Sequence, residues 1–200
     1  MDRTFYLDVN NFAVHTAYLH GFMRFSAVYL VGIFGLFVLA AWWFARQQRQ
    51  PARSVAASIW AAGGTLAAVG INQPITHAVA RPRPYYTIPG VEVLVAKAHD
   101  YTFPSDHAIT AGAATAGLWI VAHYGGRVIR WLAAVSTVFA LFIAFARVYV
   151  GAHYPGDVAA GLAIGAAIVV LGWLVLKRPL TAVVGRFAEA RLTRVLVVSR

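Results

Sequence analysis

A run of 20 residues at 26–45, SAVYLVGIFGLFVLAAWWFA, contains no charged side chain. A helix needs about 20 mostly apolar residues to cross the hydrocarbon core of a bilayer. Similar runs occur at 54–75, 107–123, 131–150 and 157–176. A segment that crosses lipid must satisfy its own backbone hydrogen bonds, which a helix does. We therefore predict an all-α membrane bundle of about five transmembrane helices that forms a single domain over 1–200.

The composition agrees with a membrane bundle. Hydrophobic residues make up 60% of the chain and charged residues 12%, whereas a soluble domain has about half and about a quarter. The chain has no cysteine, which excludes disulfides, thiolate metal sites and cysteine nucleophiles. The runs at 107–123 and 157–176 are rich in Ala and Gly, which allow close helix packing in lipid. We expect these two helices at the centre of the bundle.

Two amphipathic stretches flank the predicted spans. Near the start, apolar residues recur at helical spacing: Phe5, Val9, Phe12, Leu19 and Met23. Near the end, VVGRFAEARLTRVLVV mixes valines with arginines. Both patterns are typical of interfacial helices, and the first also allows a partial sixth span. The opening residues lack the basic segment and short apolar core of a cleavable signal peptide, so we expect none.

The formal charge of +10 is unevenly distributed. With five spans, the loops 46–53 and 123–130 lie on the same side as the C-terminal segment. These segments hold eleven of the 17 basic residues and a single acid, Glu189. Basic loops mark the cytoplasmic side of a membrane protein. We expect the excess charge to face anionic lipid there, and it requires no nucleic acid.

The alternation of spans brings a set of polar side chains to the opposite, extracytoplasmic face. The set consists of Arg81, Arg83, Ser105, Asp106, His107, Arg147, His153 and Asp157. Arginine offers forked donors that match phosphate oxygens, and a helix start offers free backbone N–H groups. Two histidines can act as nucleophile and proton donor, with an acid orienting one of them. The set favours phosphoryl transfer without metal or cofactor, beside a bundle that accepts a lipid tail.

Each of these side chains also has a structural interpretation. Ser105 or Asp106 could serve only as a helix N-cap, and Arg147 could extend to the membrane interface. His153 and Asp157 could belong to a turn and a helix start. Ionisable residues within membrane segments nevertheless favour function, and eight of them converge on one face. For the remaining histidines we expect interfacial or exposed positions without chemistry: His15, His20, His77, His99 and His123.

Three motifs resemble those of the type-2 phosphatidic acid phosphatase superfamily, over about residues 70–165. Arg83-Pro84 matches the end of the first motif, with Thr76 at its lysine position. Pro104-Ser105-Asp106-His107 is similar to the second motif, Pro-Ser-Gly-His. Ala146-Arg147, His153 and Asp157 match the third motif except for its serine.

The resemblance implies a role for each matched residue. His153 would attack phosphorus and carry a phosphohistidine, and Asp157 would orient it. His107 would protonate the leaving oxygen and later activate water. Arg83, Arg147 and Ser105 would hold the phosphate oxygens, in a phosphate-binding region that also contains Asp106 and Arg81.

The departures from the motifs resemble one branch of the superfamily, the bacitracin-resistance-type undecaprenyl-diphosphate phosphatases of bacteria. That resemblance implies a multi-pass plasma-membrane enzyme that converts a polyprenyl (undecaprenyl or decaprenyl) diphosphate carrier to its monophosphate outside the membrane, for cell-wall synthesis. Arg81 or Lys97 would replace the cation missing at Thr76. We further predict that Asp106 pairs with Arg81, because a carboxylate beside a phosphate needs a compensating cation.

Two other functions stay open at the level of sequence. The first is a phosphatase for phosphatidylglycerophosphate or phosphatidate, since no loop residue specifies the lipid tail. The second is an anion transporter, which usually has repeated halves and charges at the middle of the membrane. The chain shows no repeat, and its charges cluster at one face.

Overall fold

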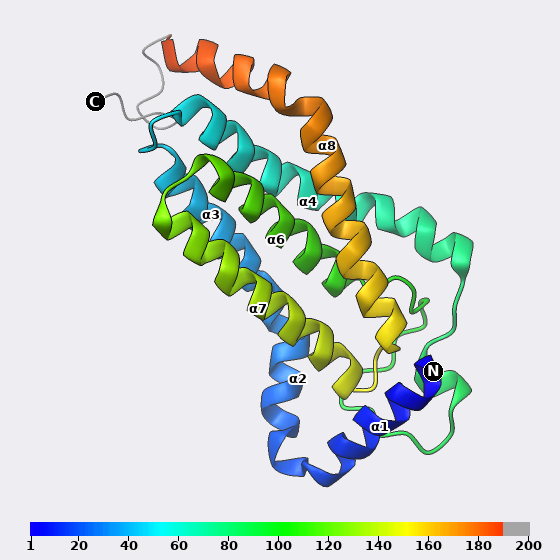
Figure 1. The fold of residues 1–200 in the computed structure, drawn as a ribbon. Coiled ribbons are helices and arrows are strands. Elements are labelled where there is room, and N and C mark those ends of the chain that lie inside the picture. The colour runs from blue at the N-terminus through cyan, green and yellow to red at the C-terminus, as the bar shows by residue number, and fades with distance from the viewer. Residues whose placement is uncertain (190–200) are drawn as a thin grey trace.

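The computed structural model describes residues 1–189, which form helices and connecting segments with no β-strand (Figure 1). The elements are α1 (Asp2–His15), η1 (Ala17–Leu19), α2 (His20–Tyr29), η2 (Leu30–Gly32), α3 (Ile33–Ala45), α4 (Pro51–Val79), α5 (Pro84–Thr87), α6 (Asp106–Tyr124), α7 (Arg127–Tyr149) and α8 (Pro155–Glu189). The predicted all-α membrane bundle is confirmed.

Within the described residues, four helical segments are long and apolar enough to cross a membrane: Ala17–Ala45, Pro51–Thr87, Arg127–Tyr149 and Pro155–Phe187. The remaining predicted span, 107–123, corresponds to α6 and is less apolar. Figure 1 shows α6 running along the bundle among the other long helices, and it packs against α3, α4, α7 and α8. A helix enclosed by others does not need an apolar surface all round.

The central packing depends on small residues, as predicted. A Cβ atom added to Gly112 of α6 would lie 2.2 Å from the carbonyl oxygen of Leu162 in α8. A Cβ atom added to Gly165 of α8 would lie 2.2 Å from the carbonyl oxygen of Ile109. Only glycine permits backbone contact this close. The contact fixes the start of α6 against the start of α8.

The first span begins earlier than the predicted residue 26. It starts at Ala17 and contains Leu19 and Met23, which the sequence pattern assigned to the amphipathic stretch. The remaining part of that stretch is α1, whose Phe5 and Phe12 are exposed. The side of α1 that faces the protein carries Tyr6, Asn10 and Ala13 instead. The helix therefore docks on the bundle through the buried ring of Tyr6 together with Asn10 and Ala13, and Val9 packs beside them.

The last helix is longer than predicted, because α8 continues from the span through Lys177 to Glu189. Figure 1 shows its C-terminal part bending over the end of the bundle where α4 begins, with Leu180 and Val184 packed against the core, and Pro179 lies within the helix. Proline removes a backbone hydrogen bond and is a common cause of such bends. The end of the predicted amphipathic C-terminal helix, 190–198, lies outside the described residues.

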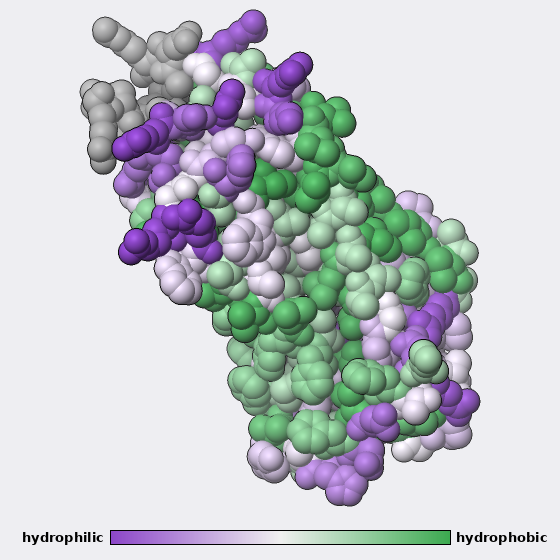
Figure 2. Space-filling model, viewed as in Figure 1, coloured by the Kyte–Doolittle hydropathy of each residue, from purple (hydrophilic) through white to green (hydrophobic). Residues whose placement is uncertain are grey.

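Hydrophilic side chains gather at the two ends of the molecule, and hydrophobic ones form a belt between them (Figure 2). One end holds the basic loops between α3 and α4 and between α6 and α7. The other holds the N-terminus, the segment 80–105 and the link between α7 and α8 (Figure 1). This distribution is that of a multi-pass membrane protein with two chemically different ends.

Candidate active site

The predicted site residues lie on three segments at the end of the bundle that contains the N-terminus. One segment follows α4, the second leads into α6, and the third links α7 to α8. The backbone joins these segments, since the Thr102 amide donates to the Arg81 carbonyl at 2.9 Å and the Ser105 amide to the Asp157 carbonyl at 3.2 Å. Residues far apart in sequence are thus held together by main-chain hydrogen bonds.

His153 is fully enclosed, with 2% of its surface exposed, and both ring nitrogens have defined partners. Its Nδ1 lies 2.9 Å from the carbonyl oxygen of Thr102 and 3.1 Å from the hydroxyl of the same residue. A carbonyl oxygen can only accept, so Nδ1 carries the ring proton. In the neutral ring, Nε2 therefore carries the unprotonated lone pair.

Two guanidinium groups approach that lone pair. Nη1 of Arg83 lies 3.3 Å from His153 Nε2, and Nη2 of Arg147 lies 3.2 Å from it. Both arginines are buried. Two cations that converge on one nitrogen, with few compensating anions, form a strong anion site.

The same surroundings keep the His153 ring neutral. Burial lowers its pKa well below the usual range, and the positive charges of Arg147 and Arg83 lower it further. A hydrogen bond to the Thr102 backbone opposes this shift without reversing it. The ring is therefore an available nucleophile at neutral pH.

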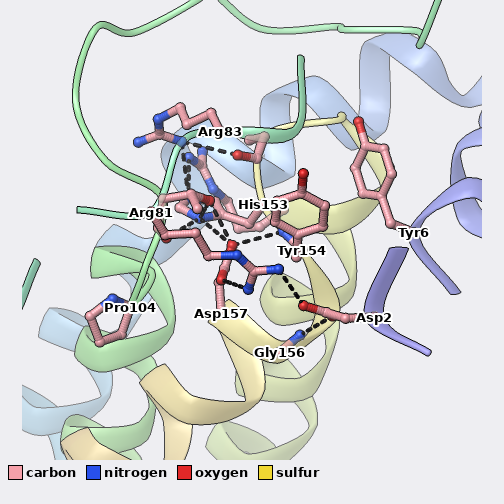
Figure 3. Close-up of polar contacts among 12 residues, drawn as sticks. Asp2, Tyr6, Arg81, Arg83, Pro104, His153, Tyr154, Gly156 and Asp157 are labelled. Atoms are coloured by element: carbon pink, nitrogen blue, oxygen red, sulfur yellow. Dashed lines mark hydrogen bonds and ion pairs between the residues drawn. The ribbon is translucent and has the colours of Figure 1, made fainter. Parts of the chain in front are cut away.

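Asp157 is fully buried and accepts three hydrogen bonds (Figure 3). Oδ2 accepts from the Thr102 hydroxyl at 2.6 Å and from the Tyr154 amide at 2.9 Å, and Oδ1 accepts from Arg81 at 2.6 Å. The distance from Oδ2 to Nδ1 of His153 is 3.9 Å, too long for a hydrogen bond. Thr102 thus stands between the acid and the histidine that the acid was predicted to orient.

Arg81 is engaged on both sides. Nη1 binds Asp157, Nη2 binds Asp2 of α1 at 2.6 Å, and the guanidinium lies 4.0 Å from the ring centre of Tyr154. Figure 3 shows Arg81 between the two carboxylates. The predicted pairing of Arg81 with Asp106 is therefore wrong.

Asp106 instead binds two amide side chains of α4. Its Oδ1 accepts from Asn72 Nδ2 at 2.6 Å and from Gln73 Nε2 at 3.3 Å. Asn72 also reaches the carbonyl oxygen of Pro104 at 3.3 Å. Neutral donors from α4 therefore satisfy the carboxylate, and no arginine or lysine in the described residues forms an ion pair with it.

The two arginines of the anion site are themselves oriented by neighbours. Arg83 donates from Nε to Asp100 at 2.7 Å, and Arg147 donates from Nη1 to the Ala27 carbonyl at 3.1 Å. Partial burial raises the pKa of Asp100, but the hydrogen bond and charge of Arg83 outweigh it, so the net pKa is lowered. Asp100 is therefore an anion that fixes one edge of Arg83.

Ser105 occupies the N-cap position of α6 without capping it. Its side chain makes no cap hydrogen bond, it is fully buried, and its Oγ has no partner within residues 1–189. The first backbone N–H groups of a helix also lack intrahelical partners. A free hydroxyl and free amides thus occupy the start of α6, where the sequence placed a phosphate.

The remaining predicted residues lie on α4, on α6 and on the segment between α5 and α6. His107 is partly buried in the first turn of α6, where the charges of Arg147 and Arg83 act on it. Thr76 has a buried Oγ1 without a partner in the described chain. Lys97 lies over the Tyr85 ring, 5.9 Å from its centre. In this arrangement Arg81 is held by acids and Lys97 faces a ring, and replacement of the missing lysine by either residue stays a prediction.

No group of three or more His, Asp or Glu side chains within residues 1–189 is placed to hold a metal ion. The polar centre of the site consists instead of arginine and histidine side chains.

Comparison with known families gives one match that covers more than half of the chain. The model of the PAP2 superfamily matches residues 57–179, which contain every matched motif residue. The chain belongs to the PAP2 superfamily. It is a membrane phosphatase of this superfamily, as predicted, and the anion transporter interpretation is set aside.

Two curated proteins and two solved structures are similar to the chain. It is 29% identical to undecaprenyl-diphosphatase BcrC of Bacillus subtilis, over 97% of the chain and 95% of the relative. It is 28% identical to an undecaprenyl-diphosphatase of Sulfolobus acidocaldarius, over 50% of the chain and 46% of that protein. The solved structures are a PAP2-type phosphatidylglycerolphosphate phosphatase of Bacillus subtilis (TM-score 0.62, 16% identity, 96% and 88% coverage) and Aquifex aeolicus LpxE (TM-score 0.58, 21% identity, 85% and 93% coverage). These two structures support the fold alone.

The sequence did not predict three residues of this site: Thr102, Asp100 and Asp2. Thr102 and Asp100 precede the second motif by a few positions, and this proximity was the only available signal. Asp2 lies 79 positions from the arginine it binds, so no local pattern connects them.

Proposed function

We propose that the chain removes the terminal phosphate of a polyprenyl diphosphate lipid at the extracytoplasmic face of a bacterial plasma membrane. The observation that carries this proposal is the position of His153 Nε2, which lies within 3.3 Å of the guanidinium groups of both Arg83 and Arg147. A phosphate bound by these arginines would present its phosphorus to the unprotonated lone pair of the imidazole. The two relatives named undecaprenyl-diphosphatases support the choice of substrate.

The first step transfers the phosphoryl group to the protein. His153 Nε2 forms a bond to phosphorus while the bond to the bridging oxygen breaks, and His107 gives a proton to that oxygen. The Nδ1 proton stays on the ring and is donated to the Thr102 carbonyl, so the phosphorylated ring is cationic. Asp157, 3.9 Å away, stabilises that charge.

The second step releases phosphate. His107, now neutral, takes a proton from water as the oxygen attacks phosphorus, and the bond to Nε2 breaks. Arg83, Arg147, the Ser105 hydroxyl and the first amides of α6 hold the phosphate oxygens through both steps. The unpartnered Ser105 Oγ supports this role, because a buried hydroxyl without a partner costs free energy unless a ligand binds it.

An apolar cavity beside the site supports a lipid substrate. It has a volume of about 510 Å³ and lies between α3 and α4, with Thr110 and Ala114 of α6 among its lining residues. Its lining includes Phe34, Leu39 and Leu66. Thr110 is one helical turn from Asp106 and His107, so a chain in this cavity would begin next to the phosphate site.

The orientation in the membrane is supported by charge. The opposite end holds Arg49, Arg53, Arg127 and Arg130, whereas the site end pairs Arg81 and Arg83 with acids. The positive-inside rule then assigns the site to the extracytoplasmic side.

Phosphate release by purified protein tests the proposal. Polyprenyl diphosphate, phosphatidylglycerophosphate and phosphatidate are supplied in parallel, with and without EDTA. We expect the diphosphate to give the highest kcat/KM, unchanged by EDTA, and vanadate to inhibit as a transition-state mimic. His153→Ala should lower turnover by roughly 10³-fold or more, whereas His123→Ala, at the far end of α6, should not. Preference for either monophosphate ester would contradict the proposed substrate.

A further inference from the structure

A series of polar contacts connects the N-terminal helix α1 to the Nδ1 side of the His153 ring. Asp2 Oδ2 binds Arg81 at 2.6 Å, Arg81 binds Asp157 Oδ1 at 2.6 Å, and Asp157 Oδ2 accepts from Thr102 at 2.6 Å. Thr102 in turn contacts Nδ1 of His153. Figure 3 shows Asp2, Arg81 and Asp157 in sequence.

Asp2 is held at this place by a second contact. Its Oδ1 accepts from the Gly156 amide at 2.8 Å, in the first turn of α8. A Cβ atom added to Gly156 would lie 3.0 Å from Asp2 Oδ2, so the carboxylate fits closely against α8. Exposed fractions of 31% for the Arg81 side chain and 33% for that of Asp2 show that solvent only partly screens the pair.

The charges of this series of contacts do not cancel. Asp2 and Asp157 are anions and Arg81 is a cation, so the three carry a net charge of −1. Arg81 alone would neutralise Asp157. Asp2 therefore supplies the excess negative charge behind the imidazole ring, on the side away from the phosphate-binding arginines.

We infer that Asp2 and Arg81 are positioning residues for the phosphoryl-transfer step. Arg81 keeps the buried Asp157 carboxylate ionised and directed at Thr102, and Asp2 both fixes Arg81 and offsets its charge. When His153 becomes a cationic phosphohistidine, the net negative charge of the three residues stabilises it. This inference rests on the proposed function, and it assigns α1 a part in the reaction.

The isosteric variant Asp2→Asn tests the charge. Asparagine keeps one acceptor oxygen, which serves either the Gly156 amide or Arg81, and removes the negative charge together with the second acceptor. We expect kcat to fall about tenfold, the scale of one charge-assisted hydrogen bond, with KM unchanged because neither residue reaches the phosphate. Asp2→Glu, which keeps the charge, should restore most of kcat.

The matched control is Asn10→Ala. Asn10 joins α1 to Glu92 through two hydrogen bonds, of 2.8 and 3.0 Å, and makes no contact with Arg81. If α1 acted only by docking on the bundle, this variant would lower kcat as much as Asp2→Asn does. We expect it to lower the thermal midpoint and leave kcat within about twofold of the wild type.

A double variant tests the order of the contacts. Arg81→Gln should lower kcat more than Asp2→Asn, and Asp2→Asn combined with Arg81→Gln should be no worse than Arg81→Gln alone, because Asp2 acts through Arg81. Additive losses, an unchanged kcat in Asp2→Asn, or a rise in KM alone would overturn the inference.

Wild-type turnover of polyprenyl diphosphate is measured first. If it is absent the proposed function fails, and the variants are compared on the lipid phosphate that the wild type hydrolyses.

Discussion

The carbonyl oxygen of Thr102 accepts a hydrogen bond from Nδ1 of His153 at 2.9 Å, and the hydroxyl of the same threonine donates to Asp157 at 2.6 Å. One residue thus fixes the tautomer of the histidine and the orientation of the acid. The histidine and the acid are 3.9 Å apart, so the threonine completes their connection.

Thr102→Val removes the hydroxyl and keeps the shape and the backbone carbonyl. The Asp157 carboxylate then loses one donor while the His153 tautomer is retained. We expect kcat to fall about tenfold, as for the loss of a hydrogen bond to a charged group, with KM little changed. Thr102→Ser, which keeps the hydroxyl, is the control in the same phosphate-release assay. Equal losses in both variants would contradict the role of the hydroxyl.

The imidazole ring of His153 should stay neutral below pH 6.5, where a free histidine is protonated. A free histidine takes up a proton near pH 6.5, but burial and the charges of Arg147 and Arg83 lower the pKa of His153 well below that value. Between pH 6.5 and the lowered pKa the ring therefore stays neutral, with the proton on Nδ1. Nitrogen-15 NMR of labelled histidine should show this tautomer at pH 6, and Arg83→Gln should raise the pKa. A cationic His153 at pH 6 in the wild type would refute the assignment.

Asp106→Gly, which introduces the common residue of the second motif, should affect stability more than selectivity. Asp106 binds Asn72 and Gln73 and leaves Arg81 untouched. We expect the free energy of unfolding to fall by about 1 kcal/mol, the typical value of one such hydrogen bond. The preference for diphosphate over monophosphate should stay as in the wild type. A changed preference for diphosphate over monophosphate, with unchanged stability, would indicate that Asp106 takes part directly in substrate binding.

Filling the apolar cavity should weaken binding of a long lipid chain. Gly35 lines it, and a Cβ atom there meets nothing within 4 Å, so Gly35→Phe introduces a large side chain at an open position of the lining. We expect KM for polyprenyl diphosphate to rise about tenfold, as loss of an apolar site of this size predicts, and KM for a short-chain diphosphate to stay constant. Gly63→Phe, at an equally open position outside the cavity lining, is the control. Equal effects on short and long chains would exclude the cavity as the tail site.

The orientation of the protein in the membrane can be determined by cysteine labelling, because the sequence contains no native cysteine. A single cysteine at Lys97 should react with a membrane-impermeant thiol reagent in intact cells, and one at Arg127 should react only after lysis. The expectation follows from the basic loops at the Arg127 end. The reverse pattern would place the site on the cytoplasmic side.

The sequence by itself determined the fold class and the set of residues at one end of the bundle. Long apolar runs allow little besides membrane helices, and the alternation of spans assigns Arg83, Arg147 and His153 to the same face whatever the helix packing. Small residues in α6 and α8 indicated the central contact for the same reason, since backbone approach in lipid depends on local residue size.

Only the tertiary structure determined which charged side chains pair with each other. The sequence pattern paired Asp106 with Arg81 because both are near the site, but a pairing depends on side-chain direction over a few ångströms. The direction in which α4 presents Asn72 gives Asp106 a neutral partner. The docking of α1 gives Arg81 a second acid, Asp2, from the far end of the sequence. Contacts between such distant residues arise from helix packing, which no local pattern encodes.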